Sequence, residues 1–218
     1  MSTSSIIAMK TKENTIKGIY CHFNGFLEHN GKYLLNSYNN YDIVLELINL
    51  GDISSLYESI ENSIFYGRDR GENNTNCFEV SFKEFNKMCQ KNWGEEYIYF
   101  FTPNRKGEYR WLYKQNTYKI KQTYETLFGK KHLIAKETIY FTTKFRELNE
   151  MEIQLESLAG ACYITGLKQC KDDPEYREYY ELSKTILPHQ LKKAREIDNN
   201  LSRFQTINYL RDVLKSKA

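Results

Sequence analysis

Residues 97–113 read YIYFFTPNRKGEYRWLY, and this stretch decides the fold class. Two runs rich in aromatic residues flank a short polar segment, in which Pro103 and Gly107 supply the backbone conformations that turns favour. In the second run every other residue is a ring, which places three rings on one face of a strand: Tyr109, Trp111 and Tyr113. The stretch therefore predicts a β-hairpin with an aromatic face.

A further strand is predicted over residues 16–23, where β-favouring residues partly alternate in polarity. Its two faces carry Ile19 and Cys21 on one side, and Tyr20 and His22 on the other. A cysteine nucleophile must hydrogen-bond its base, and Cys21 and His22 cannot do so because adjacent residues of a strand point to opposite faces. A cysteine-dependent hydrolase or transferase, one alternative function, would need a base from elsewhere, such as His29 or Asp69.

Two helices are predicted between these strands. Residues 41–50 carry apolar residues at helical spacing and precede Gly51, a residue typical of a helix C-terminus. Ser81 and Glu84 form a capping box before a second amphipathic run. Residues 16–122 are therefore predicted to form an α+β domain, an antiparallel sheet with two short helices packed on one face.

The carboxy-terminal part, residues 143–216, is predicted to be a helical domain or extension. Apolar residues recur at helical spacing over 145–162 and 191–214. The sequence DDP at 172–174 predicts another helix start, and Pro188 a bend or restart. Such helices favour a helical hairpin or bundle that packs on itself, on the sheet or on a partner, and a homodimer is one expected arrangement.

Composition bounds the class of protein. The 218 residues are 40% apolar and include 18 Tyr and 12 Phe, enough to close a core. With 31 basic and 28 acidic residues the net charge is +3, which lacks the strong stripe of a nucleic-acid-binding domain, so at most a weak RNA contact is expected. Five cysteines without paired spacing predict reduced thiols in a cytoplasm, and there is no apolar run of bilayer length. Neither a metal nor another cofactor is predicted, and no membrane contact is expected.

Several blocks occur in order along the chain: GIYCHFNGF at 18–26, GKYLLNSY at 31–38, LGDISSL at 50–56, YGRDRGE at 66–72 and EYIYFF at 96–101. They resemble a group of short bacteriophage and prophage proteins that carry an aromatic-Cys-His-aromatic-Asp-Gly motif and a later Arg-Asp-Arg-Gly-Glu turn. The resemblance covers about residues 16–118, with Asn24 where those relatives usually have Asp. It implies a phage-derived, intracellular, soluble protein that is cytoplasmic in a bacterial host cell, and it supplies no catalytic residues.

Candidate binding residues fall into three groups. Arg68, Asp69 and Arg70 lie on a predicted turn, where two guanidiniums either hold a phosphate or carboxylate of a partner or form an internal ion-pair network. The rings of the hairpin, Tyr109, Trp111 and Tyr113, either stack on single-stranded nucleic acid or pack in the core. Tyr20 and His22, on their shared strand face, complete the candidates.

Together these features favour a non-enzymatic phage-derived protein that inhibits a host protein or ribonucleoprotein complex, such as an RNA-guided CRISPR nuclease of antiviral defence. The chain lacks the short motifs of phosphate-binding loops, serine hydrolases and zinc peptidases. An alternative is a protein that sequesters a nucleotide or small molecule, which would require an enclosed pocket near Arg68 and Arg70.

Overall fold

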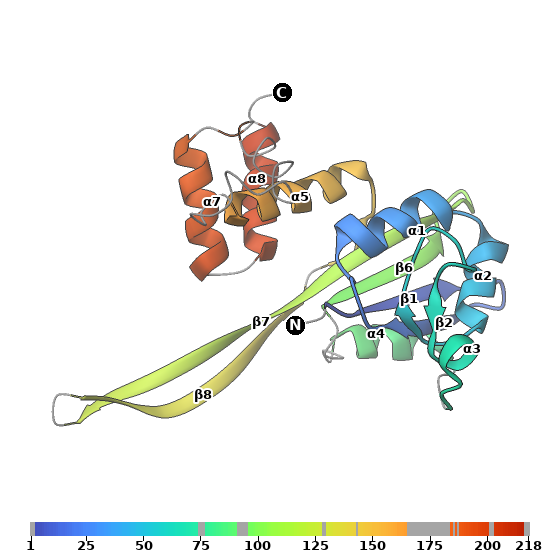
Figure 1. The fold of residues 1–218 in the computed structure, drawn as a ribbon, viewed down its shortest axis with the longest axis horizontal. Coiled ribbons are helices and arrows are strands. Elements are labelled where there is room, and N and C mark those ends of the chain that lie inside the picture. Colours follow the sequence, from blue (N-terminus) through green and yellow to red (C-terminus); the bar gives the residue numbers. More distant parts are fainter. Residues whose placement is uncertain are drawn as a thin grey trace.

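The structure is a computed structural model that describes residues 3–73, 77–90, 96–127, 130–142, 144–164, 184, 186, 188–200 and 203–215. Figure 1 shows a twisted sheet covered by helices, a group of helices beside it, and a long two-stranded ribbon that projects beyond the edge of the sheet. The α+β class that the sequence predicts is confirmed.

Nine strands form the sheet within the described ranges, in the order β4-β3-β2-β1-β6-β7-β8, with β5 on β2 and β9 on β7. They are β1 (Ser5–Lys10), β2 (Thr15–Cys21), β3 (Ile53–Ser55), β4 (Ile64–Phe65), β5 (Phe78–Ser81), β6 (Tyr97–Pro103), β7 (Tyr109–Leu127), β8 (Lys130–Thr142) and β9 (Arg146–Glu147). Most pairs are antiparallel, but β1 pairs parallel with β6, and β2 with β3. The expectation of a wholly antiparallel sheet is wrong at these two pairs, because local alternation does not specify strand direction.

β1 lies in the middle of the sheet, between β2 and β6. Ile7 and Met9 are buried in the core on one face, and Ile6 and Ala8 in the core on the other. A strand that is buried on both faces has a continuous apolar run rather than an alternating one. β1 precedes residue 16, where the sequence pattern places the start of the α+β domain.

Helices cover both faces of the sheet. They are the π-helix η1 (Leu27–Gly31), α1 (Lys32–Ser37), α2 (Tyr41–Asn49), α3 (Tyr66–Arg70) and α4 (Phe82–Gln90), followed by α5 (Glu150–Ile164), α7 (Pro188–Asn200) and α8 (Arg203–Lys215). Val44 and Leu47 of α2 pack in the core that contains Ile7, whereas Phe85 of α4 packs with Phe100 in the opposite core. The two predicted helices exist, but they lie on opposite faces rather than on one.

The ends of these two helices follow the sequence signals. The Asn40 side chain accepts a hydrogen bond from the backbone nitrogen of Asp42 at 2.8 Å, and Gly51 has a φ of 89° just after α2. The backbone nitrogens of Ser81 and Glu84 each donate to the other residue's side chain, at 3.0 and 3.3 Å. The capping box at the start of α4 is thereby confirmed.

The carboxy-terminal helices form a bundle. α5, α7 and α8 share a core of Leu155, Leu158, Ala159, Ile186, Ala194, Ile207 and Leu210, as the helical pattern predicts. α5 begins at Glu150 rather than near 145, because residues 146–147 pair with β7 as β9. Pro188 is the first residue of α7. The predicted helix start at 172–174 lies outside the described residues.

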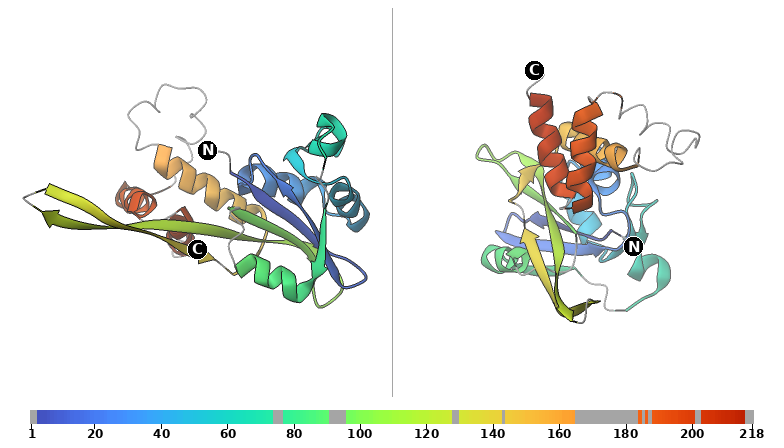
Figure 2. Two further views of the ribbon diagram at one scale, coloured as in Figure 1. Left: turned by 90° about the horizontal axis from the view of Figure 1, so that it is seen from below. Right: turned by 90° about the vertical axis from the view of Figure 1, so that its left-hand side faces the viewer.

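β7 is a continuous strand of 19 residues. Its first part pairs with β6 as far as Gln115, and its second part pairs with β8 from Asn116 to Leu127. The two views in Figure 2 show that this second part leaves the sheet as a long ribbon. Among the described strands, β8 pairs with β7 alone.

Candidate functional site

Three of the sequence blocks, at 18–26, 50–56 and 66–72, meet at one end of the sheet. β2 pairs with β3 through Cys21 and Ile53. Beyond the end of β2, the backbone nitrogens of His22 and Phe23 donate to the carbonyls of Ile53 and Ser54, both at 3.0 Å. β4 and α3 follow β3 and bring the third block alongside.

Asp52 connects the first block to the third. Its carboxylate accepts from the backbone nitrogen of Tyr20 at 2.8 Å, and its carbonyl accepts from the backbone nitrogen of Tyr66 at 3.0 Å. Partial burial raises the pKa of the Asp52 carboxyl. The residue therefore fixes the position of α3 relative to β2.

Asn24 and Gly25 turn the chain out of β2. Asn24 has a φ of 57°, a left-handed conformation that Asn and Asp adopt more readily than most residues. A Cβ atom on Gly25 would lie 2.6 Å from the carbonyl oxygen of Ser4, so this position requires glycine. Asn24 is therefore compatible with this turn, as Asp would be.

Two pairs of side chains in these blocks are in contact, Tyr20 with His22 and Tyr66 with Arg70, and we call these four residues the motif face. The Tyr20 hydroxyl and His22 Nδ1 are 2.7 Å apart. Arg70 donates to Ser54 Oγ at 2.8 Å, and its guanidinium lies over the Tyr66 ring, 5.0 Å from the centroid. The Arg70 side chain remains 43% exposed, so it can contact a partner.

Arg68 and Asp69 point toward their own loop. Arg68 donates to both carboxylate oxygens of Asp69, at 2.8 and 2.9 Å, and to the carbonyls of Ile60 and Ser63 at 2.9 and 2.5 Å. Asp69 also accepts from the backbone nitrogen of Phe65, and its hydrogen bonds with Arg68 lower the pKa of the Asp69 carboxyl. The predicted turn is the short helix α3, and of its two interpretations the geometry favours the internal network for Arg68 and Asp69.

The aromatic residues of β7 do not form an open stacking surface. Trp111 and Tyr113 are buried, and Tyr109 is partly buried in the same core. The Trp111 indole nitrogen donates to the carbonyl of Tyr38 at 2.7 Å. The stacking hypothesis is therefore wrong for Trp111 and Tyr113, because helices cover this face of the sheet.

Cys21 lies in the core on the face opposite to His22. Its sulfur accepts from the side-chain nitrogen of Asn30 at 3.2 Å, and it is fully buried. Burial raises the pKa of the Cys21 thiol to about 11. A thiol in this state is protonated at neutral pH and is a poor nucleophile.

We expect Cys21 to resist alkylation in the folded protein. At pH 8 its thiolate fraction is about 100-fold below that of an ordinary thiol, and burial excludes the reagent, whereas Cys77 is partly exposed. Mass spectrometry of peptides after timed iodoacetamide treatment should show Cys77 labelled at least 100-fold faster. Equal rates for the two thiols would restore the cysteine-dependent enzyme as a candidate.

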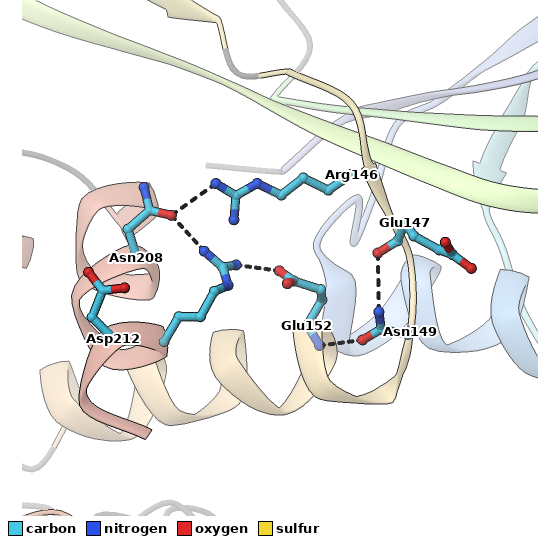
Figure 3. Close-up of a pocket in the computed structure, with 7 residues that line it drawn as sticks. Arg146, Glu147, Asn149, Glu152, Asn208 and Asp212 are labelled. Carbon is cyan, nitrogen blue, oxygen red and sulfur yellow. Dashed lines mark hydrogen bonds and ion pairs between the residues drawn. The ribbon is translucent and has the colours of Figure 1, made fainter. Parts of the chain in front are cut away.

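A polar hollow of about 660 Å³ lies where β9, α5 and α8 meet (Figure 3). Arg146 and Arg211 both donate to the side-chain oxygen of Asn208, at 3.1 and 2.6 Å. Arg211 also donates to Glu152 at 2.5 Å, and the same carboxylate oxygen accepts from the Tyr113 hydroxyl at 2.5 Å. These five residues, which we call the polar clasp, join the sheet to the helical bundle.

Glu156 makes a second buried contact one turn further along α5. Its carboxylate accepts from the Tyr97 hydroxyl and, at 2.5 Å, from the backbone nitrogen of Leu27. Gln115 donates to the same Tyr97 hydroxyl at 2.9 Å. Glu152 and Glu156 together hold α5 against the sheet.

These two carboxylates are not among the candidates that the sequence singles out, because the helical pattern over residues 145–162 consists of apolar residues alone. Glu152 and Glu156 are four residues apart and so share one helix face. Buried tyrosine hydroxyls, such as those of Tyr97 and Tyr113, need hydrogen-bond partners. The coincidence of these two features is the signal that could have identified the contact.

Within the described ranges, no group of three or more His, Cys, Asp or Glu residues could hold a metal ion. None of the helices that the structure describes combines the length and apolar character that crossing a bilayer requires. Comparisons with protein families, with curated proteins and with solved structures give no significant match. Function must therefore be inferred from the site itself.

Proposed function

We propose that the protein is a non-enzymatic binding protein that recognises a macromolecular partner through its motif face. The observation that carries this proposal is the meeting of three sequence blocks at one end of the sheet, where Arg70 is exposed and Tyr20, His22 and Tyr66 are partly exposed. Arginine and tyrosine are among the residues that most often dominate the binding energy of protein interfaces.

Two further observations support binding over catalysis. Cys21 is enclosed and burial raises the pKa of its thiol to about 11, and His22 contacts the Tyr20 hydroxyl on the strand face opposite to Cys21. Arg68 and Asp69 hold the turn that presents Arg70, which gives the exposed guanidinium a rigid support. A preorganised side chain loses less conformational entropy on binding.

The partner that we propose is a host protein or ribonucleoprotein complex of antiviral defence, such as an RNA-guided CRISPR nuclease. The resemblance of the three blocks to phage proteins motivates this choice, and inhibition by surface coverage needs no chemistry of the inhibitor's own. A protein that sequesters a nucleotide would instead show a rise in melting temperature when the nucleotide is added.

Affinity capture from a bacterial host lysate tests the proposal. We expect the wild-type protein to enrich a partner that mass spectrometry identifies, and His22→Ala/Arg70→Ala to recover about 30-fold less of it, as for the loss of 2 kcal/mol at an interface. The matched control is Arg105→Ala/His189→Ala, which removes the same residue types at exposed positions elsewhere.

Two results would contradict the proposal: no protein enriched over an empty support, or equal recovery by both double variants. A second assay measures phage survival in hosts with and without an RNA-guided nuclease. Expression of the wild-type protein should raise the plating efficiency of a targeted phage, and expression of His22→Ala/Arg70→Ala should not. Protection that is absent in all hosts would remove defence complexes as the partner.

A further inference from the structure

None of the helices and strands that the structure describes covers the outer half of the ribbon formed by residues 116–127 of β7 and by β8 (Figures 1 and 2). Its pairing runs from Asn116 opposite Thr142 to Leu127 opposite Lys130, with one shift in register after Thr123. At about 3.3 Å per residue, these positions extend about 36 Å. An isolated two-stranded ribbon is only marginally stable in water, so a ribbon of this length is suited to contact with a partner.

The ribbon carries the whole net charge of the chain. Residues 116–142 contain five lysines and two glutamates. Removing these from the 31 basic and 28 acidic residues of the chain leaves 26 of each. The rest of the protein is therefore formally neutral, and the excess of three positive charges belongs to the ribbon.

The register spreads these lysines along the ribbon. Lys119 and Lys121 lie opposite Ile139 and Glu137, Lys136 lies opposite Gln122, and Lys131 and Lys130 lie opposite Thr126 and Leu127. They span about 26 Å at the rise of a β-strand. Over that distance a DNA duplex presents a phosphate charge about every 1.7 Å of its axis.

The shape of the ribbon selects among nucleic acids. The major groove of B-form DNA is about 12 Å wide and admits a two-stranded β-ribbon. The major groove of an A-form RNA helix is deep and narrow and does not. From the projecting shape and the confined positive charge, we infer that the ribbon binds double-stranded DNA through its phosphate backbone.

This inference goes beyond the proposed function and does not depend on it, because the motif face lies at the end of β2 and on α3 rather than on the ribbon. His22→Ala/Arg70→Ala is expected to bind DNA as the wild type does. Failure of the partner capture and failure of the DNA measurement therefore lead to separate conclusions.

Fluorescence anisotropy of a labelled 20-base-pair duplex of arbitrary sequence, titrated with the full-length protein, is the test. If all five lysines contact phosphates, log Kd rises with log salt with a slope of about 4.5, so affinity falls about 500-fold between 50 and 200 mM salt. The ribbon variant changes all five lysines: Lys119→Gln, Lys121→Gln, Lys130→Gln, Lys131→Gln and Lys136→Gln.

The control changes five exposed lysines outside the ribbon: Lys32→Gln, Lys83→Gln, Lys87→Gln, Lys106→Gln and Lys192→Gln. Each variant loses five charges, so its formal net charge falls from +3 to −2. At 50 mM salt we expect the ribbon variant to bind at least 100-fold more weakly than the wild type, and the control to stay within threefold.

Three outcomes would overturn the inference: no binding by the wild type at 50 mM salt, retained affinity in the ribbon variant, or an equal loss in the control. Circular dichroism checks that each variant is folded. If the ribbon variant does not fold, a second variant replaces residues 119–139 with Asn-Gly and closes the strands at Tyr118 and Tyr140. The same loss of affinity is then expected, and retained binding would overturn the inference.

Discussion

Replacing Glu152 with alanine is expected to lower the free energy of unfolding by about 3–5 kcal/mol, because it leaves the Arg211 guanidinium buried without its counter-ion. The Glu152 and Arg211 side chains are 11% and 13% exposed and lie 2.5 Å apart. The Tyr113 hydroxyl loses its acceptor in the same variant. Urea unfolding followed by circular dichroism gives the change.

The matched control is Glu147→Ala, which breaks the surface ion pair between Glu147 and Arg110. The Glu147 side chain is 53% exposed and the Arg110 side chain is 42% exposed. Exposed pairs contribute about 0–1 kcal/mol, so this variant should be nearly as stable as the wild type. In Glu152→Ala/Arg211→Ala no unpaired buried charge remains. The loss in free energy of unfolding should therefore be about 1–3 kcal/mol smaller than the sum of the losses in Glu152→Ala and Arg211→Ala. A loss below 1 kcal/mol in Glu152→Ala would show that the polar clasp does not hold the bundle on the sheet.

Trp111→Ala should destabilise the protein by a similar amount, about 3–5 kcal/mol. The ring is 2% exposed, it packs 4.9 Å from the Phe101 ring between centroids, and its indole nitrogen donates to the carbonyl of Tyr38. Removing it leaves a cavity in the core and an unpaired carbonyl. Thermal and urea unfolding both measure this loss.

Two further variants separate the loss of packing from the loss of the indole hydrogen bond and supply a control at an exposed ring. Trp111→Phe keeps most of the packing and loses the N–H donor, so it should cost about 1–3 kcal/mol. Phe82→Ala removes a ring that is 49% exposed, and it should change stability by less than about 0.5 kcal/mol. If Trp111→Ala were as mild as Phe82→Ala, the aromatic face of β7 would not be part of the core.

Local signals in the sequence are sufficient to predict the structure where a residue interacts with its immediate neighbours along the chain. The capping box of Ser81 and Glu84 and the left-handed Gly51 both lie where the pattern places them. The alternation of Tyr109, Trp111 and Tyr113 also predicts the shared face of these rings. Hydrogen bonds within four residues, and the period of a strand, are specified by the residues themselves.

Contacts between distant segments were not predictable in the same way. The parallel pairing of β1 with β6 joins residues far apart in the chain, and no short pattern specifies a partner or a direction. The position of α4 on the opposite face also depends on how β5 pairs with β2. Burial of Glu152 and Glu156 is favourable only because Tyr97, Tyr113 and Arg211 reach them from other elements.

The candidate site shows the same division. The sequence identifies Arg68, Asp69 and Arg70 as one group, yet the fold separates their roles. Arg68 and Asp69 bond to the 58–63 loop and to Phe65, whereas Arg70 contacts Ser54 and Tyr66. The difference arises because adjacent residues of a helical turn point about 100° apart.

The central place of β1 also has a consequence during synthesis. β1 and β2 can form their hairpin as soon as residue 21 has left the ribosome, but β6 is made about 80 residues later. At about 5–20 residues per second, the open edge of β1 therefore waits on the order of 4–16 seconds for its parallel neighbour. An exposed edge with an apolar run is a template for wrong pairing with another nascent chain. Slow translation of residues 22–96 would lengthen this period of vulnerability.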